Sequence, residues 1–141
     1  MSKVDLVTER QQVVFGNDSV VIVKHGADLA GGRALDVDGI TELVLEAGRV
    51  IVTDGNGVYK PLPITATTDK SGATTYAYNA LPDGYAYAGI LCGSILTAKP
   101  AASILIAGVV NEAALLVPFG DQATAIKAAL PNIVFVKDEV A

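Results

Sequence analysis

The stretch YAYAGILCGSILTAKPAASILIAGVVNEAALLVPFG, from Tyr85 to Gly120, decides the fold of this chain. Its long runs of β-type apolar residues carry only two charges, Lys99 and Glu112. Surface strands usually alternate apolar with charged residues, whereas this stretch interposes Gly, Ala and Ser. Both faces of its strands therefore need cover. We expect the domain's own core to cover one face, and a subunit or partner protein to cover the other.

The composition indicates one acidic, apolar domain. A chain of 141 residues is long enough for a single domain with its own core. Its net charge is -5, and its ten basic residues are scattered, which argues against nucleic-acid binding because that binding needs clustered Lys and Arg. A hydrophobic content of 51% beside 18% charged residues favours a surface hidden by oligomerisation.

The cellular location follows from the single cysteine and the N-terminal sequence. Cys92 is the only cysteine and lies in an apolar run, so no intrachain disulfide can form and we expect folding in a reducing cytoplasm. MSKVDLVTERQQ carries charges where a signal peptide needs an apolar region. No apolar run approaches the roughly 18 residues of a membrane span, so we expect a soluble protein without membrane contact.

The segment RVIVTDGNGVYKPLPI, residues 49–64, predicts a β-hairpin. Asp54-Gly55-Asn56-Gly57 supplies turn residues that accept positive φ between two β-rich runs. Pro61 and Pro63 cannot donate ladder hydrogen bonds, so the second strand should lie at a sheet edge or leave the sheet there.

The rest of the chain predicts a mainly β domain with one or two short helices near the C-terminus. Asn111 is a possible N-cap of a helical NEAALL segment. Asp121 can cap a second helix that places Ile126, Ala129 and Leu130 on one stripe. The other expected elements are a hairpin from 13–15 through 16–18 to 20–23, a loop at 26–33, a strand starting at 34–37, turns at 46–48 and 81–84, a polar loop or exposed hairpin at 65–78, strands at 87–96 and 103–110, and a final strand at 132–137.

Candidate catalytic residues are few. His25 is the only histidine, and a lone loop histidine is usually structural or solvated. Cys92 fits a small core hydrophobe, and Ser94 lacks the glycine two residues later that a nucleophile elbow requires. We therefore expect no enzyme and no cofactor.

Metal sites are not expected either. Asp36-Val37-Asp38-Gly39 and Asp54-Gly55-Asn56-Gly57 resemble calcium loops, but their twelfth positions are Ala47 and Thr65 where a bidentate Glu is needed, so turn chemistry explains both. Transition metals are disfavoured because His25 and Cys92 are the only soft or borderline ligands. Tyr76, Tyr78, Tyr85 and Tyr87 could stack on a sugar or a partner, although cross-strand packing explains them more simply.

The order of features in the last third resembles a known family. A strand at Gly89-Ile90-Leu91 is followed by a second strand ending at Gly108, a short helical NEAAL segment ending at Pro118, a polar helix and a terminal IVFV strand. This pattern, over roughly Arg49 to Val136, resembles the C-terminal part of the lambda-type head decoration proteins of tailed phages. It is also similar to the capsid-binding portion of some phage head fibre proteins.

The resemblance implies a small β-barrel or β-tulip-like decoration domain that forms a homotrimer on the outer surface of an expanded capsid, on a virion assembled in the host cytoplasm. The partner would be the phage major capsid protein, and the trimer would stabilise the shell by thermodynamic linkage. Residues 1–14 would form an extended N-terminal arm and residues 15–141 the decoration domain. In the family the arm adds a strand to the capsid protein. The arm residues here are Ser2, Lys3, Val4, Asp5, Leu6, Val7, Thr8, Glu9, Arg10, Gln11, Gln12, Val13 and Val14.

Two other functions stay open. A carbohydrate-binding or adhesive module on a virion or cell surface would use the tyrosine cluster. An enzyme would need His25 or Cys92 at its centre, together with polar groups gathered from distant segments.

Overall fold

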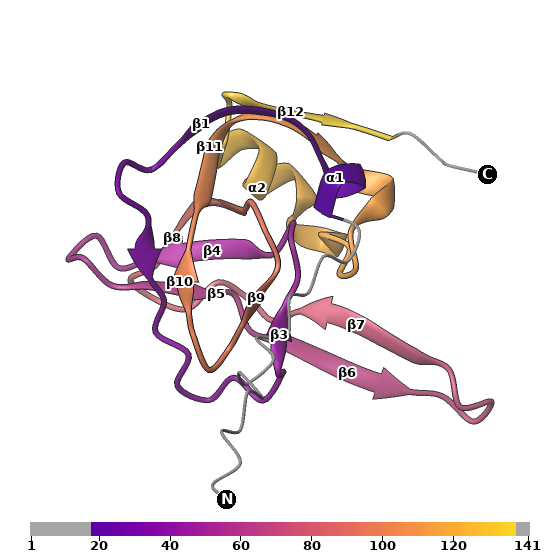
Figure 1. Ribbon diagram of the computed structural model, residues 1–141. Helices are drawn as coiled ribbons and strands as arrows, with labels where there is room; N and C mark the ends of the chain where they lie inside the picture. Colours follow the sequence, from indigo (N-terminus) through magenta and orange to yellow (C-terminus); the bar gives the residue numbers. More distant parts are fainter. Residues whose placement is uncertain (1–17, 138–141) are drawn as a thin grey trace, which may run out of the picture.

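The computed structural model describes residues 18–137, so the expected arm at 1–14 and the first strand of the hairpin expected at 13–23 lie outside the described residues. Within that range, β-strands predominate, and the short helices lie mainly near the C-terminal end (Figure 1). The prediction of a mainly β fold is therefore confirmed. In the described part of the chain the strands form several sheets that do not close into a barrel.

One central sheet and three two-stranded sheets make up the domain. The central sheet has the order β1-β11-β8-β4-β5, and β12 pairs in parallel with β11. Its strands are β1 (Ile22–Asp28), β4 (Val50–Thr53), β5 (Tyr59–Pro61), β8 (Ala86–Leu91), β11 (Ile104–Asn111) and β12 (Ile133–Val136). The small sheets pair β2 (Arg33–Ala34) with β10 (Ala101–Ala102), β3 (Val44–Leu45) with β9 (Ile95–Leu96), and β6 (Ile64–Thr68) with β7 (Thr74–Tyr78). The helices are α1 (Asp18–Val21), α2 (Ala123–Ala129) and the 3-10 helices η1 (Glu112–Ala114) and η2 (Gly120–Gln122).

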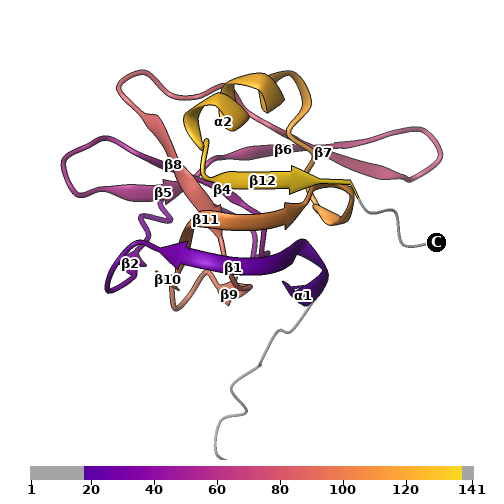
Figure 2. The ribbon, with the colours of Figure 1, turned by 90° about the horizontal axis from the view of Figure 1, so that it is seen from above.

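Strand β11, from the charge-poor stretch, is the most connected strand of the sheet. It pairs with β1 along one edge. On its other edge, Ile104 and Leu105 pair with β8, whereas Gly108 to Asn111 pair with β12 (Figure 2). A strand that has neighbours on both edges must be apolar on both faces when both are covered, which explains why this stretch carries so few charges.

The chain itself covers both faces of the central sheet around β4 and β8, whereas the edge strand β1 is largely exposed. Along β4, Val50 and Val52 pack into a core beneath α2, while Ile51 packs into a second core formed with the segment that contains β2 and β3. Figure 2 shows α2 on the opposite side of the domain from β2, β9 and β10. The expectation that a subunit or partner covers the second face is therefore wrong, because the loops and short strands of residues 29–45 and 95–102 supply that cover.

The hairpin prediction for residues 49–64 is confirmed. Strands β4 and β5 pair antiparallel, and Asp54 Oδ1 accepts hydrogen bonds from the Asn56 N–H at 2.7 Å and the Val58 N–H at 3.2 Å. Strand β5, which ends at Pro61, lies at the edge of the sheet as expected. The exposed hairpin expected at 65–78 is present as β6–β7, which projects from the body of the domain (Figures 1 and 2).

Three expectations in the first half of the chain and in the charge-poor stretch are corrected. Helix α1 includes residues 20 and 21, where the strand expected at 20–23 was to begin, because a helical turn buries Val21 in the core while Asp18 bonds to Ser94. His25 belongs to strand β1 and is not in a loop. The strand expected at 87–96 is interrupted after Leu91, because the chain bends at residues 92–94 before β9 begins.

The helices expected near the C-terminus are present, but one of the two predicted N-caps is wrong. Asn111 caps η1, since its side chain accepts a hydrogen bond from the Ala113 N–H at 3.2 Å. Asp121 lies inside η2 and does not cap α2. Instead, Gln122 positions the helix by donating to the Asn79 carbonyl at 2.7 Å and accepting from the Tyr87 hydroxyl at 2.6 Å. Ile126 and Leu130 are buried as expected, whereas Ala129 of the same predicted stripe is exposed.

No helix in residues 18–137 is both long enough and apolar enough to cross a membrane.

Candidate functional site

One hollow of the described surface lies between the start of β4 and the base of the β6–β7 hairpin. We call it the Leu43 groove, because Leu43 is 84% exposed at its edge. Leu116, which is 55% exposed, also lines the groove. The groove has a volume of about 200 Å³ and is lined by Glu42, Leu43, Val44, Glu46, Ala47, Gly48, Arg49, Ile64, Tyr76, Tyr78, Leu116 and Val117.

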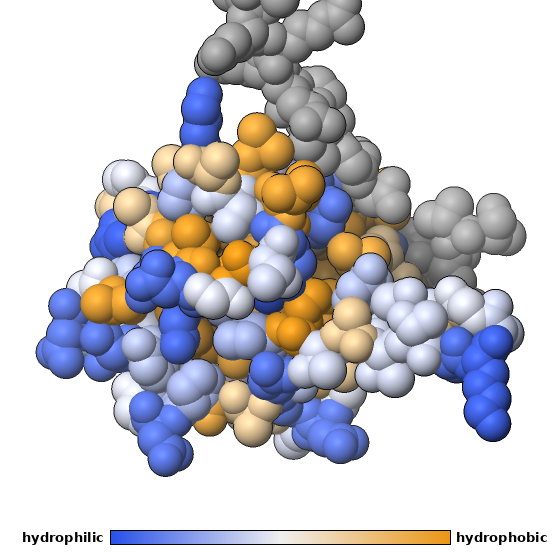
Figure 3. Space-filling view, turned by 90° about the horizontal axis from the view of Figure 1, so that it is seen from below, coloured by the Kyte–Doolittle hydropathy of each residue, from blue (hydrophilic) through white to orange (hydrophobic). Residues whose placement is uncertain are grey.

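Seen from below, the domain has hydrophobic residues gathered near the centre of its surface, between hydrophilic ones (Figure 3). The paler β6–β7 hairpin extends to one side of them. Large side chains as exposed as Leu43 and Leu116 and adjacent to a hollow are typical of protein interaction surfaces. The Leu43 groove is therefore the candidate interface of the domain.

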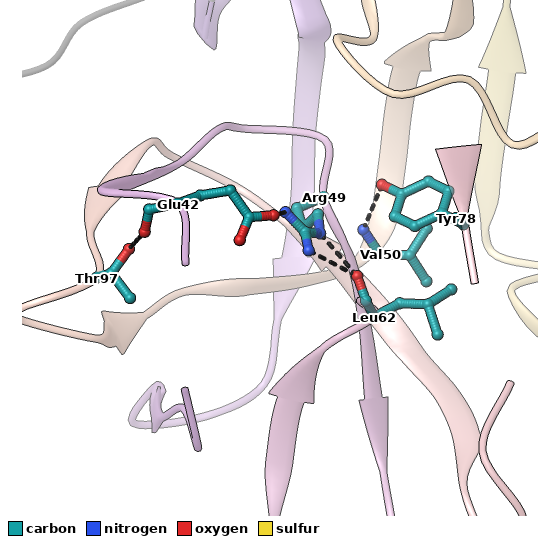
Figure 4. A network of polar contacts seen from close by, with 6 residues as sticks. All are labelled: Glu42, Arg49, Val50, Leu62, Tyr78 and Thr97. Carbon is teal, nitrogen blue, oxygen red and sulfur yellow. Dashed lines mark hydrogen bonds and ion pairs between the residues drawn. The ribbon is translucent and has the colours of Figure 1, made fainter. Parts of the chain in front are cut away.

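A buried arginine holds the floor of the groove in place (Figure 4). The Arg49 guanidinium donates to the Leu62 carbonyl through Nε at 2.9 Å and Nη2 at 2.7 Å, and it pairs with Glu42 Oε1 at 3.2 Å. Arg49 is 6% exposed, so its charge depends on these partners. Glu42 is held in turn by Thr97, whose hydroxyl donates to the Glu42 carbonyl. The groove is thus a rigid surface built on a satisfied polar network.

Of the four grouped tyrosines, Tyr78, Tyr85 and Tyr87 pack against the core, and Tyr76 and Tyr78 line the groove. The Tyr78 hydroxyl accepts a hydrogen bond from the Val50 N–H at 3.0 Å, and burial raises the pKa of Tyr78 to about 12. Tyr87 bonds to Gln122, and the Lys60 ammonium lies 4.2 Å from the centre of the Tyr85 ring. Tyr76 lines the groove. Packing therefore explains Tyr78, Tyr85 and Tyr87. Of the two tyrosines that line the groove, Tyr78 is fixed by its hydrogen bond to Val50, which leaves Tyr76 as the one placed to contact a ligand.

Ser94 links the first described residue to the domain. Asp18 Oδ2 accepts from the Ser94 N–H at 2.8 Å, and the Ser94 hydroxyl donates to Asp18 Oδ1 at 2.5 Å. The same hydroxyl accepts from the Ala47 N–H at 3.0 Å. Asp18 lies in a second hollow that shares Glu46, Ala47 and Leu116 with the Leu43 groove. The chain that precedes Asp18 therefore starts from a fixed point beside the groove.

The candidate catalytic residues His25 and Cys92 meet at Asp28. His25 Nε2 lies 2.6 Å from Asp28 Oδ1, and the Cys92 thiol donates to the same oxygen at 3.2 Å. Burial works against ionisation of Asp28, but hydrogen bonds from Ser103 and Cys92 together with the His25 side chain hold the pKa of this carboxyl below its usual range. Burial raises the pKa of the Cys92 thiol, and the neighbouring Asp28 adds to this effect, so that the pKa is about 12. Cys92 therefore carries its proton at neutral pH, and a protonated thiol is a poor nucleophile.

The two calcium-like segments are turns, as the sequence predicts. Asp36 Oδ1 accepts from the Asp38 N–H at 3.1 Å, in the same manner as Asp54 with Asn56. These carboxylates cap backbone N–H groups of their own turns.

The predicted arm residues, Ser2 to Val14, lie outside the described residues, so the structure places none of them. No family model, curated protein or solved structure matches this chain.

The sequence did not indicate two features of the surface. The Leu43 groove joins residues from four distant segments, and the only local signal for it was Leu43 itself, an apolar residue just before a short strand. The meeting of His25 with Cys92 depends on strand pairing that brings residues 25–28 beside residues 92–103. The spacing of these residues in the sequence does not predict that pairing.

Proposed function

We propose that this chain is a structural protein of a phage virion, which binds the outer surface of the expanded head as a homotrimer and stabilises the head. The capsid partner comes from the resemblance of residues 49–136 to lambda-type decoration proteins. The elements on which the resemblance depends follow in the same order in the fold: β8, β11, η1, α2 and β12.

The observation that carries the proposal is the position of Asp18 beside the Leu43 groove. Ser94 holds Asp18, so the residues before it begin at a defined place on the domain surface. Those 17 residues, if fully extended, could reach roughly 55 to 60 Å, far enough to contact a neighbouring molecule. In the proposed mechanism this arm adds a strand to the capsid protein.

The Leu43 groove is where we place the contact between copies of the chain. Leu43 projects from one wall, and apolar side chains of Ile64, Tyr76 and Leu116 line the hollow next to it. When this surface packs against a different patch of the next copy, the contact is head-to-tail, and it closes into a ring when the rotation is threefold. Three linked arms then engage the lattice at high effective concentration, so weak strands together bind tightly.

Two variants separate the roles of the arm and the groove. Deleting Met1 to Gln12 should leave a folded trimer that no longer co-sediments with expanded heads. Leu43→Glu should give a folded monomer whose head binding is greatly weakened, because the avidity of three arms is lost. Val134→Glu is the matched control, since Val134 is also exposed, at 56%, but lies on β12 away from the groove residues.

The measurements are the mass of the protein in solution and its co-sedimentation with expanded phage heads. A strictly monomeric wild-type chain that stays in the supernatant would overturn the proposal. Full head binding by the truncated chain would remove the role of the arm.

A carbohydrate-binding or adhesive function is the second candidate, and Tyr76 in the groove is the observation that favours it. Aromatic side chains offer the apolar face on which a sugar ring can stack. Glycan binding that is lost in Tyr76→Ala but retained in Tyr85→Ala, with no change in head binding, would support this function over capsid decoration.

A further inference from the structure

A cluster of three potential metal ligands lies at the edge of the central sheet, away from the Leu43 groove. His25 and Asp28 belong to the edge strand β1, and Cys92 follows the end of β8. One ligand atom from each residue lies within 4.8 Å of the other two. The cluster therefore gathers an imidazole nitrogen, a carboxylate oxygen and a thiol sulfur from segments more than 60 residues apart.

An irregularity in β1 places His25 and Asp28 on the same side. In a regular strand, side chains three residues apart point to opposite faces. The pairing of β1 with β11 shifts register between His25 and Ala27 and again between Ala27 and Asp28. Gly26 allows β1 to lie close to β11 at this point, because a Cβ at position 26 would lie 2.7 Å from the Ala107 carbonyl oxygen. Bulges of this kind are common where a side chain is redirected toward a site.

Ser103 orients the carboxylate of Asp28. Its hydroxyl donates to Asp28 Oδ2 at 2.7 Å, which leaves Oδ1 directed at His25 and Cys92. The Cys92 N–H donates to the Ser103 carbonyl at 3.0 Å, so the thiol and the orienting hydroxyl are held on adjacent paired segments. Metal sites regularly contain residues that hydrogen-bond to a metal ligand and fix its orientation.

We propose that His25, Asp28 and Cys92 bind a divalent transition-metal ion, of which Zn²⁺ best fits the donor set. Zn²⁺ accepts imidazole, carboxylate and thiolate ligands together, whereas Ca²⁺ and Mg²⁺ take oxygen ligands. Three protein ligands leave a fourth position for water. The His25 side chain is 53% exposed, so the ion can enter from solvent. This site is independent of the proposed capsid binding.

When the metal ion binds, bonds to the ion replace the contacts of Asp28 with His25 and with Cys92. The Cys92 thiol releases its proton to solvent and binds as thiolate. His25 Nε2, which faces Asp28, binds as the neutral imidazole whose proton is on Nδ1. Ligand atoms of a tetrahedral Zn²⁺ site lie about 3.3 to 3.6 Å apart. The 3.2 Å contact between Cys92 and Asp28 is close to that value, and the half-exposed His25 must move back by about 1 Å from its present 2.6 Å contact.

A metal ion here would join the edge strand β1 to the end of β8 across the start of β11. A ligand that binds only the folded state stabilises it in proportion to its occupancy. We therefore expect Zn²⁺ to raise the thermal stability of the domain.

The test uses the reduced, tag-free full chain with Co²⁺ and Zn²⁺ as probes. Cys92 is the only cysteine and His25 the only histidine, so a thiolate-to-cobalt charge-transfer absorption can come only from Cys92. We expect this absorption on adding Co²⁺ and its loss on adding Zn²⁺. Zn²⁺ at roughly 100 times its Kd should raise Tm by about 9 °C.

Variants decide whether the three residues act together. His25→Ala, Asp28→Asn and Cys92→Ser should each weaken Zn²⁺ binding by roughly 10- to 100-fold or more, and Ser103→Ala by about tenfold. Asp83→Asn, in an exposed turn, is the control and should bind as wild type. His25 is exposed, so His25→Ala tests the site even if a variant at Cys92 fails to fold. The proposal is overturned if wild type shows no cobalt–thiolate absorption, if the absorption persists unchanged in His25→Ala and Asp28→Asn, or if solution mass shows that the ion only links Cys92 residues of two chains.

Discussion

Strand β11 and the β6–β7 hairpin are both β-structure, but they depend on the rest of the molecule in opposite ways. β11 has strand partners on both edges, and its residues Ile104, Leu105 and Val110 are completely buried. The hairpin forms its ladder only with itself, and most of its residues are exposed threonine, alanine and turn residues. Burial on both faces stabilises the first region, whereas local turn chemistry and one internal ladder stabilise the second.

This difference makes the hairpin a separable projection joined to the core at one end. Its last residue, Tyr78, is the point of attachment, because its hydroxyl bonds to β4 and its side chain packs against the core. Mutations in β11 should therefore destabilise the whole domain. Mutations in the hairpin should destabilise the domain less the farther they lie from Tyr78.

The largest effect is expected from Leu105→Ala. Leu105 is completely buried beneath α2, and removing its side chain leaves a cavity that the rigid sheet cannot fill. The free energy of unfolding should fall by about 3 kcal/mol, measured by urea denaturation. Thr67→Ala, at an exposed position of β6, is the control and should change it by less than about 0.5 kcal/mol. Equal losses in the two variants would contradict the distinction between the regions.

The next effect appears at alkaline pH and concerns Tyr78. Burial raises the pKa of Tyr78 to about 12 in the folded domain, whereas a tyrosine in the unfolded chain titrates near 10. Between these values the unfolded state binds fewer protons, so stability falls as pH rises from about 10 to 12, by about 2 to 3 kcal/mol in total from this group. Stability measured against pH should fall less steeply in Tyr78→Phe than in wild type. Identical slopes would show that Tyr78 is not a buried attachment of the hairpin.

A smaller loss of stability is expected from Arg49→Lys. This variant tests whether the Arg49 network supports the groove, which lies between the two regions. Lysine keeps the charge but cannot reproduce the two hydrogen bonds to the Leu62 carbonyl while it pairs with Glu42. The free energy of unfolding should fall by about 2 kcal/mol in chemical denaturation. Lys60→Arg, on the edge strand β5, should be close to neutral. A neutral Arg49→Lys would mean that the network does not support the groove.

The smallest effect is expected from Gly72→Ala at the tip of the hairpin. Gly72 has φ +85°, a conformation that costs an alanine about 1 kcal/mol, although nothing lies within 4 Å of the new Cβ. Amide hydrogen exchange should increase in β6 and β7 and stay unchanged in β11. Faster exchange in β11 would show that the hairpin and the central sheet unfold as one unit.

Several elements were predictable because their signals are local. The turn at Asp54 to Gly57, the edge position of Pro61, the exposed hairpin and the Asn111 cap all depend on residues within a few positions of each other. The predictions that were wrong depended on distant partners. Helix α1 forms where Val21 can enter the core, and α2 is positioned by Gln122 bonding to Tyr87 and not by a cap from Asp121.

By itself, the sequence determined that this is a mainly β domain whose charge-poor stretch must be buried on both faces. Hydrophobic pattern and turn chemistry act over short distances, so they are readable without a structure. Only the tertiary structure decided what buries that stretch, which is this chain's own segment around residues 29–45. It also decided that Leu43 faces a groove beside Asp18 and that His25 and Asp28 meet Cys92, because strand pairing and a bulge bring these residues together.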